Sequence, residues 1–247
     1  MCGRMTLTTT DLADVVDALA AEIAPEDAPR YRARFNVAPS DLHWIVDVRR
    51  GHRVLHPDIW GYLASGRPLI NVRSEPLSDG KGFRGAFESR RCVVVSDGFL
   101  EWTRPAREPV WYHRTNGGLV LLAGLYQHGG AGADDDCLFP RFTVLTTRPN
   151  ALVAQVHDRM PVVISPEQLG EWLTAPPARA AALLAPAPDD ALVATGVSRR
   201  VSSVKNDDPG CLAPRSLDGP RAGARTDGAD TAAPGHRERR QGRLFDL

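Results

Sequence analysis

A series of short apolar runs between Phe35 and Val163 is the feature that most limits how this chain can fold. Turn residues separate the runs, and the runs are rich in β-branched and aromatic residues, which is typical of β-strands. The runs are HWIVDV, CVVVSDGFLEW, VWYHR, LVLLAGLY, FTVLTT and MPVVI. They predict one domain rich in mixed or antiparallel strands.

Helical patterns are few and short. Residues 11–23, DLADVVDALAAEI, carry apolar residues at helical spacing behind Asp11, a candidate N-cap. We predict two further short helices around residues 81–88 and 150–156. The segment SPEQLGEWL has a Ser cap with Gln at the third helical position, which is the signature of a capping box. With a last strand at ALVATGVS, the chain is predicted to be a single α+β domain that ends near Leu212.

Residues 213–247 differ in composition from the rest of the chain. They are crowded with Pro, Gly, Ala, Arg and Asp and contain almost no large apolar residues. Such a segment buries too little apolar surface to offset the entropy lost on folding. We therefore predict that residues 213–247 form a disordered C-terminal tail.

Charge and cysteine content limit the class of protein. The formal net charge of the 247 residues is +0, so any nucleic-acid site must be a local patch. The four cysteines, at positions 2, 92, 137 and 211, show no C-x-x-C pair and no metal-ligand spacing. No signal-peptide pattern and no membrane-length apolar run is present. We expect a cytoplasmic monomer with reduced thiols, no membrane partner and neither metal nor cofactor.

Four stretches place polar residues among apolar neighbours, where they cost free energy unless they are paired or take part in function. The stretches are FNVAPS (35–40), INVRSE (70–75), SDGFLEW (96–102) and VHDRMPVVI (156–164). Each also has a structural interpretation. Asn71 could close a turn, Glu101 could pair with Arg159, and His157 could cap a helix. A cysteine at position 2 could equally be incidental.

Taken together and in this order, MCGR, N-x-R-S-E, D-G-F-x-E-W and H-x-R-M-P resemble the SRAP (SOS response-associated peptidase) family of abasic-site sensors. FNVAPS, Trp60–Gly61, AGLY at 123–126 and Thr146–Thr147 add further matches. The resemblance covers roughly residues 2–212 and implies an SRAP-type α+β domain with a barrel-like core and short flanking helices. The chain departs from the family between Trp60 and Asn71, where it is shorter, and at Val72 and Leu100.

The resemblance implies a covalent bond between Cys2 and an abasic site in single-stranded DNA. It also implies that Met1 is removed, either by an aminopeptidase or by the protein's own peptidase activity. An α-amine with a pKa of about 7.7–8.0 is roughly one-fifth neutral near pH 7.3, whereas a lysine near 10.4 is only about 0.1% neutral. The free amine of Cys2 would attack the aldehyde, and the thiol would then close a five-membered thiazolidine ring.

The family also implies roles for the other motif residues. Glu101 would be the general acid and base, His157 would hydrogen-bond the sugar or the imine, and Asn71 would orient Cys2. The remaining candidates would contact DNA, with arginines on phosphates and an aromatic residue on a base; they are Arg4, Asn36, Trp60, Arg73, Thr147 and Arg159.

Two other functions remain open from the sequence. An N-terminal-nucleophile amidohydrolase also begins with Cys-Gly after loss of methionine, but it usually continues with Ile where this chain has Arg4. A non-covalent single-stranded-DNA-binding module would leave Cys2 without a chemical role.

The end of the tail carries a separate short pattern. QGRLF, with Gln241, Leu244 and Phe245, resembles the Q-x-x-L-F peptide by which bacterial repair proteins bind the replication sliding clamp. A short apolar peptide on a disordered tether suits this mode of binding. A tail that merely ends in Leu and Phe is the simpler interpretation.

Overall fold

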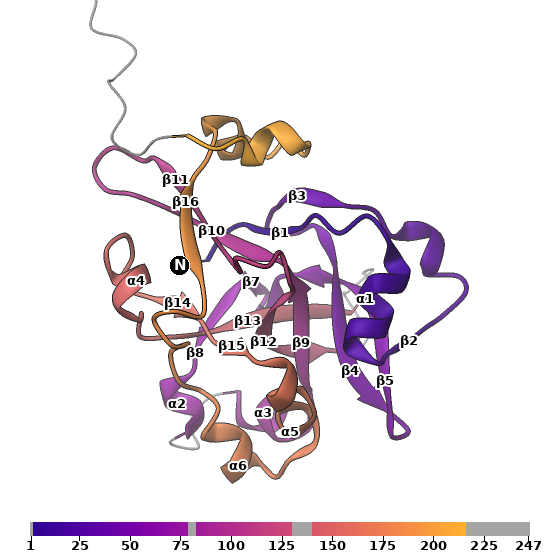
Figure 1. Ribbon diagram of the computed structural model, residues 1–247. Coiled ribbons are helices and arrows are strands. Elements are labelled where there is room, and N and C mark those ends of the chain that lie inside the picture. The colour runs from indigo at the N-terminus through magenta and orange to yellow at the C-terminus, as the bar shows by residue number, and fades with distance from the viewer. Residues whose placement is uncertain (1, 79–82, 130–139, 216–247) are drawn as a thin grey trace, which may run out of the picture. The chain divides into compact units, whose positions relative to one another are not determined.

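The computed structural model describes residues 2–78, 83–129 and 140–215 (Figure 1). β-strands dominate this part of the chain. The strands are β1 (Met5–Leu7), β2 (Glu22–Ile23), β3 (Arg34–Val37), β4 (Leu42–Arg49), β5 (His52–Trp60), β6 (Tyr62–Ala64), β7 (Arg67–Leu69), β8 (Asn71–Arg73), β9 (Arg91–Ser96), β10 (Gly98–Trp102), β11 (Pro109–His113), β12 (Val120–Gln127), β13 (Arg141–Thr147), β14 (Met160–Pro161), β15 (Val163–Ile164) and β16 (Val193–Gly196). The helices are α1 (Leu12–Leu19), α2 (Glu75–Ser78), α3 (Arg84–Ser89), α4 (Ala151–Ala154), α5 (Leu169–Thr174) and α6 (Pro177–Ala181).

Five strands of the larger sheet close on themselves. The order β13-β12-β9-β4-β5 is antiparallel throughout, and a parallel pairing of β13 with β5 joins the two ends. Closure leaves these strands without an open edge for unpaired backbone groups. The prediction of an α+β domain with a mixed, strand-rich and barrel-like core is confirmed.

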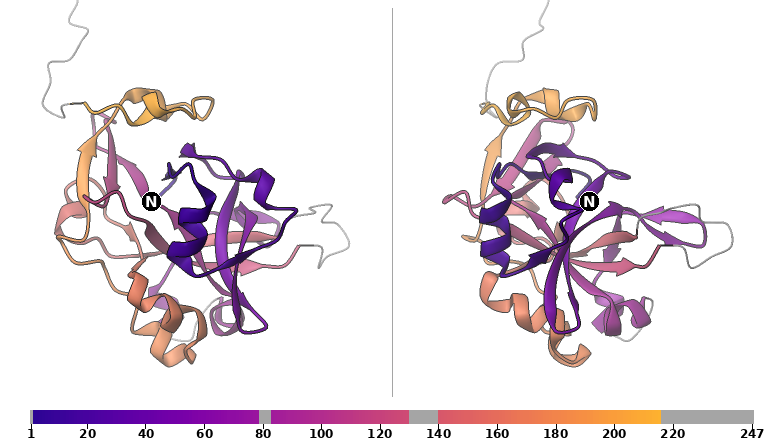
Figure 2. Two further views of the ribbon diagram at one scale, coloured as in Figure 1. Left: turned by 45° about the vertical axis from the view of Figure 1, so that its right-hand side comes forward. Right: turned by 90° about the vertical axis from the view of Figure 1, so that its right-hand side faces the viewer.

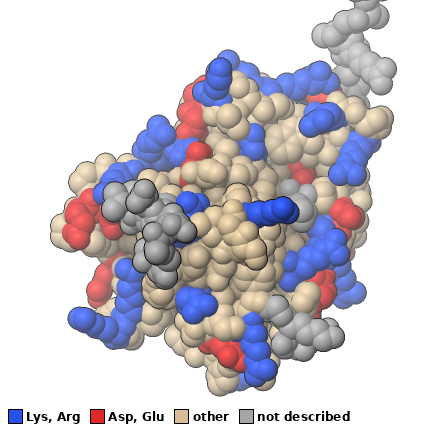
Figure 3. All heavy atoms as spheres, turned by 180° about the vertical axis from the view of Figure 1, so that it is seen from behind, with Lys and Arg blue, Asp and Glu red and all other residues tan. Residues whose placement is uncertain are grey.

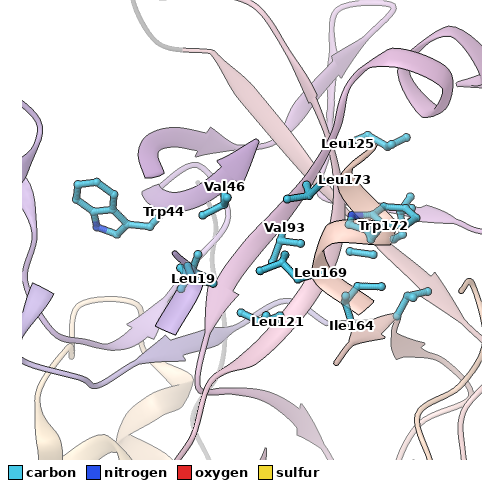
Figure 4. Packing of buried hydrophobic residues seen from close by; sticks show 14 of the residues in the cluster. Leu19, Trp44, Val46, Val93, Leu121, Leu125, Ile164, Leu169, Trp172 and Leu173 are labelled. Carbon is cyan, nitrogen blue, oxygen red and sulfur yellow. The ribbon is translucent and has the colours of Figure 1, made fainter. Parts of the chain in front are cut away.

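Successive side chains of the five closed strands, called the ring below, point to opposite faces of the sheet and so separate two apolar cores. In β9, Val93 and Val95 face one core, while Cys92 and Val94 face the other. The first core packs under α1, α3, α5 and α6, and Figure 4 shows Trp172 among its aliphatic side chains. In Figures 1 and 2, α5 and α6 lie side by side along this face. The second core lies between the ring and a smaller sheet, and Cys2 belongs to it.

The smaller sheet holds the start of the chain. Its order is β16-β11-β10-β1-β3, and every pairing is antiparallel. Met5 of β1 lies opposite Phe99 of β10, so the residues before β1 run alongside the end of β10. Figure 1 shows the N-terminus beside this sheet. The sheet therefore brings the first residues of the chain next to the SDGFLEW stretch.

The helices are shorter than the sequence suggests. α1 ends at Leu19 because Ala20 adopts a left-handed φ of 46°, and Glu22–Ile23 then forms β2, so the predicted helix over residues 11–23 is wrong at its C-terminal end. The helix around residues 150–156 is α4, capped by Asn150. The helix around residues 81–88 is α3 at 84–89; residues 81 and 82 lie outside the described part. The capping box formed by Ser165 and Gln168 is confirmed.

The end of the domain lies slightly later than predicted. Pro214 forms a β-bridge with Val197, and the Arg215 amide donates to the Gly196 oxygen at 2.7 Å. Residues 213–215 therefore still contact the fold. The rest of the predicted tail, including Gln241, Leu244 and Phe245, lies outside the described residues. Within the described part, none of the helices has the length and apolarity needed to cross a membrane.

Candidate active site

Cys2 is buried just before β1, where its thiol donates to the main-chain oxygen of Arg4 at 3.5 Å. That oxygen also accepts the Leu100 amide at 3.1 Å, which fixes the first residues against β10. Burial raises the pKa of the Cys2 thiol well above its ordinary value, and the negative charge of Glu101 raises it further. The thiol is therefore neutral at physiological pH, and Glu101 lies close enough to act on it.

Asn71 holds Cys2 from the opposite side. It begins β8, which pairs in parallel with β13, and its side-chain amide donates to the Cys2 oxygen at 2.8 Å. Its Oδ1 is buried and makes no hydrogen bond within residues 2–78, 83–129 and 140–215. A buried acceptor without a donor is costly, so the amide is set to accept a further donor close to Cys2.

Glu101 is only 4% exposed and lies in β10 opposite Val110 of β11. Burial raises its pKa to about 7, while the positive charge of Arg104 acts in the opposite direction. A carboxyl group with this pKa is present as both acid and base near neutral pH, which suits proton transfer in both directions. The hydroxyl of Tyr112 is buried, and burial together with the Glu101 charge raises the pKa of Tyr112.

His157 follows α4 and lies across the same pocket from Glu101. Its Nδ1 accepts the Arg159 amide at 3.0 Å, and the Asp158 carboxylate also lies 3.0 Å from Nδ1. Burial lowers the pKa of His157, although Asp158 acts in the opposite direction. A neutral ring that accepts at Nδ1 carries its proton on Nε2 and can donate it there.

Glu101 and His157 line one pocket of about 540 Å³. The other lining residues come from the end of β10 and the turn that follows it; they are Trp102, Thr103, Arg104, Pro105 and Arg107. The predicted quartet of Cys2, Asn71, Glu101 and His157 is thus brought together from four separate parts of the chain. Within the described residues, no group of His, Cys, Asp or Glu side chains could hold a metal ion.

Asp97 anchors β1, the strand that follows Cys2. Its carboxylate accepts the Thr6 hydroxyl at 2.5 Å, the Thr8 amide at 2.5 Å and the Thr8 hydroxyl at 2.6 Å. The next residue must be glycine because a Cβ at Gly98 would lie 2.2 Å from Nε1 of Trp111. The Asp-Gly step of SDGFLEW therefore positions β1, a role that the sequence prediction did not assign.

Two of the predicted DNA-contacting arginines are at least partly exposed, Arg4 being half-buried and Arg73 exposed. Arg4 lies 6.0 Å above the Trp102 ring, and its Nε makes no hydrogen bond within the described segments. Arg73 is exposed at the end of β8, opposite Thr146 of β13. Both placements are compatible with phosphate contacts.

The other four predicted DNA-contacting residues make contacts within the protein. Trp60 is completely buried, stacks on Phe142 and donates to the Ile70 oxygen, so it has no exposed face for a base. Arg159 forms a two-pronged pair with Glu75 and donates to the Thr146 oxygen.

Asn36 donates to the carbonyls of Ser203 and Asn206, and Thr147 donates to the Leu184 oxygen at 3.4 Å. Asn36 and Thr147 are both less than 5% exposed. Strand residues with both neighbours buried give no alternation signal, so the sequence could not distinguish an inward side chain from an outward one.

Sequence reasoning also missed residues that line the pocket. Arg104 and Arg107 lie in the turn after β10, a polar stretch with no periodicity to mark it. The sequence signal available was their position within six residues of Glu101.

Comparison with known proteins identifies the family of this chain. The family profile described as SOS response associated peptidase (SRAP) matches residues 1–204. The abasic site processing protein YoqW of Bacillus subtilis is 33% identical over 224 residues, covering 85% of this chain and 97% of the relative. The abasic site processing protein YedK of Escherichia coli is 29% identical over 181 residues, covering 70% of this chain and 79% of the relative.

Solved structures share the fold. A protein from Bacteroides thetaiotaomicron superposes with a TM-score of 0.72 at 18% identity, covering 87% of this chain and all of that one. A phage-related protein from Bordetella bronchiseptica gives a TM-score of 0.64 at 27% identity, covering 80% of this chain and 95% of that one. The matched segment contains Cys2, Asn71, Glu101 and His157, and the chain belongs to the SRAP family.

Proposed function

We propose that this protein binds single-stranded DNA at abasic sites and forms a thiazolidine crosslink through Cys2 once Met1 has been removed. The proposal depends on three groups that lie together. Cys2 is buried, the Asn71 side chain donates to its main-chain oxygen, and the neighbouring Glu101 carboxyl group has a pKa of about 7. The names of the relatives, abasic site processing proteins, support this choice of substrate.

The raised pKa of the thiol sets the order of the steps. A neutral thiol is a weak nucleophile, so the α-amine of Cys2 attacks the ring-opened sugar aldehyde first. The new carbon–nitrogen bond gives a carbinolamine, which loses water to become a protonated imine. The sulfur then adds to the imine carbon, and the electron pair of the double bond moves to the nitrogen, which keeps its proton. The products are one thiazolidine ring and one water molecule.

Glu101 moves the protons in this sequence. In its acid form it protonates the departing hydroxyl of the carbinolamine; as the resulting carboxylate it accepts the proton of the Cys2 thiol during ring closure. A pKa of about 7 makes both directions accessible without a large energetic cost. His157 donates from Nε2 to an oxygen of the opened sugar, and Asn71 holds the Cys2 oxygen so that amine and thiol stay in place.

Removal of Met1 is a separate hydrolytic step. Hydrolysis of the Met1–Cys2 peptide bond converts the Cys2 nitrogen from an amide to an amine. We propose that Glu101 assists this peptidase reaction in the protein itself. Intact-mass measurement tests this idea: Met1 should be absent in the wild type and retained in Glu101→Ala. If Met1 is absent from both proteins, an aminopeptidase removes it.

The crosslink is tested by mixing the protein with a single-stranded oligonucleotide that contains one abasic site and separating the products on a denaturing gel. We expect a shifted band that disappears when the aldehyde is blocked with methoxyamine beforehand. A band of equal intensity with Cys2→Ala would contradict the proposal. Binding in a native gel with no denaturing-resistant band would favour the non-covalent binding module.

The amidohydrolase alternative has its own test. Such an enzyme needs a thiolate at Cys2, and the raised pKa of the thiol disfavours that form. Release of ammonia from glutamine that depends on Cys2 would establish this alternative; we expect none.

The proposed site of action is DNA in the cytoplasm. Clamp binding through Gln241, Leu244 and Phe245 is a separate proposal. It fails if a peptide of residues 241–247 does not bind a purified sliding clamp at high micromolar concentration.

A further inference from the structure

The turn of residues 103–108, between β10 and β11, forms one wall of the pocket that contains Glu101 and His157. Two of its side chains, Arg104 and Arg107, line the pocket and are exposed. We define these two residues as the arginine turn. Its position raises the question of what two guanidinium groups do beside the chemical centre.

In the part of the chain that the structure describes, neither guanidinium group makes an ion pair or a hydrogen bond. Arg199, at the base of the same turn, is instead paired with Glu108. Arg215 also contacts Glu108, so that carboxylate is already occupied by two cations. The arginine turn therefore presents two positive charges without a protein counterion of their own.

The backbone of the turn is firmly held. The Thr103 amide donates to the Glu108 oxygen at 2.9 Å, the Arg107 amide donates to the Thr103 oxygen at 2.8 Å, and the Glu108 amide donates to the Thr103 hydroxyl at 3.0 Å. Arg107 has a left-handed φ of 55°, a conformation in which glycine or asparagine is normally favoured. The left-handed backbone of Arg107 therefore costs conformational free energy, which favourable interactions elsewhere in the protein must offset.

The acidic groups at the pocket lie elsewhere than on the arginine turn, so they do not compete with an anion bound there. The side chain of Asp158 is 85% exposed, but it contacts His157 on the segment after α4 and not on the arginine turn. Glu101 is buried beneath the pocket, and its raised pKa makes it partly neutral at physiological pH. The positive charge of Arg104 acts on both Glu101 and His157, so it lies on the pocket side of the turn.

We propose that Arg104 and Arg107 bind phosphodiester groups of the DNA strand on one side of the lesion and so position the sugar over Glu101. The proposal rests on the proposed function for the identity of the strand, and it adds a phosphate-binding site that the recognised motifs do not include. Arg4 and Arg73 come from other elements, so the strand would be held from more than one direction. Arginines suit this role because a planar guanidinium group can form paired hydrogen bonds with phosphate oxygens.

Binding to intact single-stranded DNA, which contains no aldehyde, tests the phosphate contacts separately from the chemistry. Arg107→Gly removes the guanidinium group and relieves the left-handed backbone. Arg50→Gly is the matched control, because Arg50 is also exposed, has a φ of 52° and lies in the hairpin between β4 and β5. Figures 1 and 2 show that hairpin away from the N-terminus.

We expect Arg107→Gly to weaken binding about threefold and the double variant Arg104→Ala/Arg107→Gly about tenfold at low salt, with Arg50→Gly unchanged. The slope of log affinity against log salt should fall by about 1.4 in the double variant, since each phosphate contact on a single strand contributes about 0.7. Wild-type affinity and slope in the double variant would overturn the proposal, as would an equal loss in Arg50→Gly.

Crosslinking to abasic oligonucleotides with single neutral methylphosphonate linkages then locates the phosphates. In the wild type, one or two positions beside the lesion should raise the half-saturating protein concentration several-fold; the double variant should be insensitive at those same positions. Equal sensitivity of the two proteins at every position would overturn the proposal. If the wild type forms no crosslink at all, the proposed function fails, while the binding experiment still decides the role of the arginine turn.

Discussion

The side-chain amide of Asn71 donates to the main-chain oxygen of Cys2 at 2.8 Å and so ties β8 to a residue 69 positions earlier in the chain. This contact holds the start of the chain from one side, while the pairing of β1 with β10 holds it from the other. The Cys2 backbone therefore has a defined orientation next to Glu101. In a terminal residue this is unusual, because chain ends are normally poorly ordered unless they are tied down.

Loss of the Asn71 contact should slow crosslinking more than it affects the fold. Asn71→Ala removes one hydrogen bond and should lower the free energy of unfolding by about 1 kcal/mol. The crosslinking rate should fall about tenfold or more, because a loosely held terminus loses its orientation. Single-turnover gels and urea unfolding measure the two quantities. Asn71→Asp has similar size but no amide donor, so it should behave like Asn71→Ala; a wild-type rate in both variants would contradict this role.

Substitution of Cys2 should separate the imine from the ring. Cys2→Ala and Cys2→Ser keep an α-amine after Met1 removal but lack the thiol, so they can form only a reversible imine. We expect their denaturing-gel band to appear only after borohydride reduction, whereas the wild-type band should need no reduction. A heat-stable band from Cys2→Ala without borohydride would show that the product is not a thiazolidine.

In protein from which an added aminopeptidase has removed Met1, Glu101→Gln should lower the crosslinking rate about 100-fold, the lower range for loss of a general acid and base. The amide has the size of the carboxyl group but cannot exchange protons. The wild-type rate should change between pH 6 and 8 as Glu101 titrates around its pKa of about 7, and the variant should lose that dependence. Rates from pH 5 to 9 test this expectation; an identical pH profile in the variant would assign the titration to another group.

The same variant should be more stable than the wild type at high pH. The folded-state pKa of Glu101 is about 7 against an ordinary value of 4.5, so the folded protein binds the proton more tightly. The stabilisation that comes from this proton is fully present below pH 4.5 and is lost as the pH rises through 7, by on the order of 3 kcal/mol. Urea unfolding at pH 8 should therefore show Glu101→Gln above the wild type. A lower stability of Glu101→Gln at pH 8 would contradict the raised pKa.

Asp97→Ala should destabilise the protein by about 2 to 4 kcal/mol, because it leaves the Thr6 and Thr8 donors without their acceptor. Amide hydrogen exchange in β1 should accelerate before that of β9, which lies within the closed ring. Asp17→Ala, on the exposed face of α1, is the control and should change stability by less than about 0.5 kcal/mol. Equal effects of the two substitutions would show that Asp97 does not anchor β1.

His56 should lower the free energy of unfolding as the pH rises, whereas a carboxylate with a lowered pKa does so as the pH falls. Burial lowers the pKa of His56, but its hydrogen bonds with Asp47 and Asp58 outweigh burial, and the net shift is upward. The raised pKa stabilises the protein below the ordinary value of 6.5, and this contribution is lost as the pH rises through the folded-state value. Thermal unfolding of the wild type between pH 6 and 9 should show this decline, and His56→Gln should not.

Charge alone could not have located the site. The face in Figure 3 carries Lys and Arg interspersed with Asp and Glu around a largely neutral centre, in keeping with the formal net charge of zero. A locally unpaired pair of arginines is visible only when their neighbours in space are known. The contacts of Trp60 and Arg159 with Phe142 and Glu75 also could not be read from the sequence, because these partners are distant along the chain.

The sequence by itself determined the strand-rich fold and the capped helices, and its resemblance to the SRAP family implied the four residues of the candidate centre. Local alternation, caps and spaced motifs are properties of neighbouring residues, so they can be read without a structure. Only the tertiary structure decided which polar side chains share a pocket. The pairing of β1 with β10 brings Cys2 to Glu101, and the turn after β10 brings Arg104 and Arg107 to the same place. Burial, pKa and access depend on contacts between distant segments, and those contacts exist only once the chain has folded.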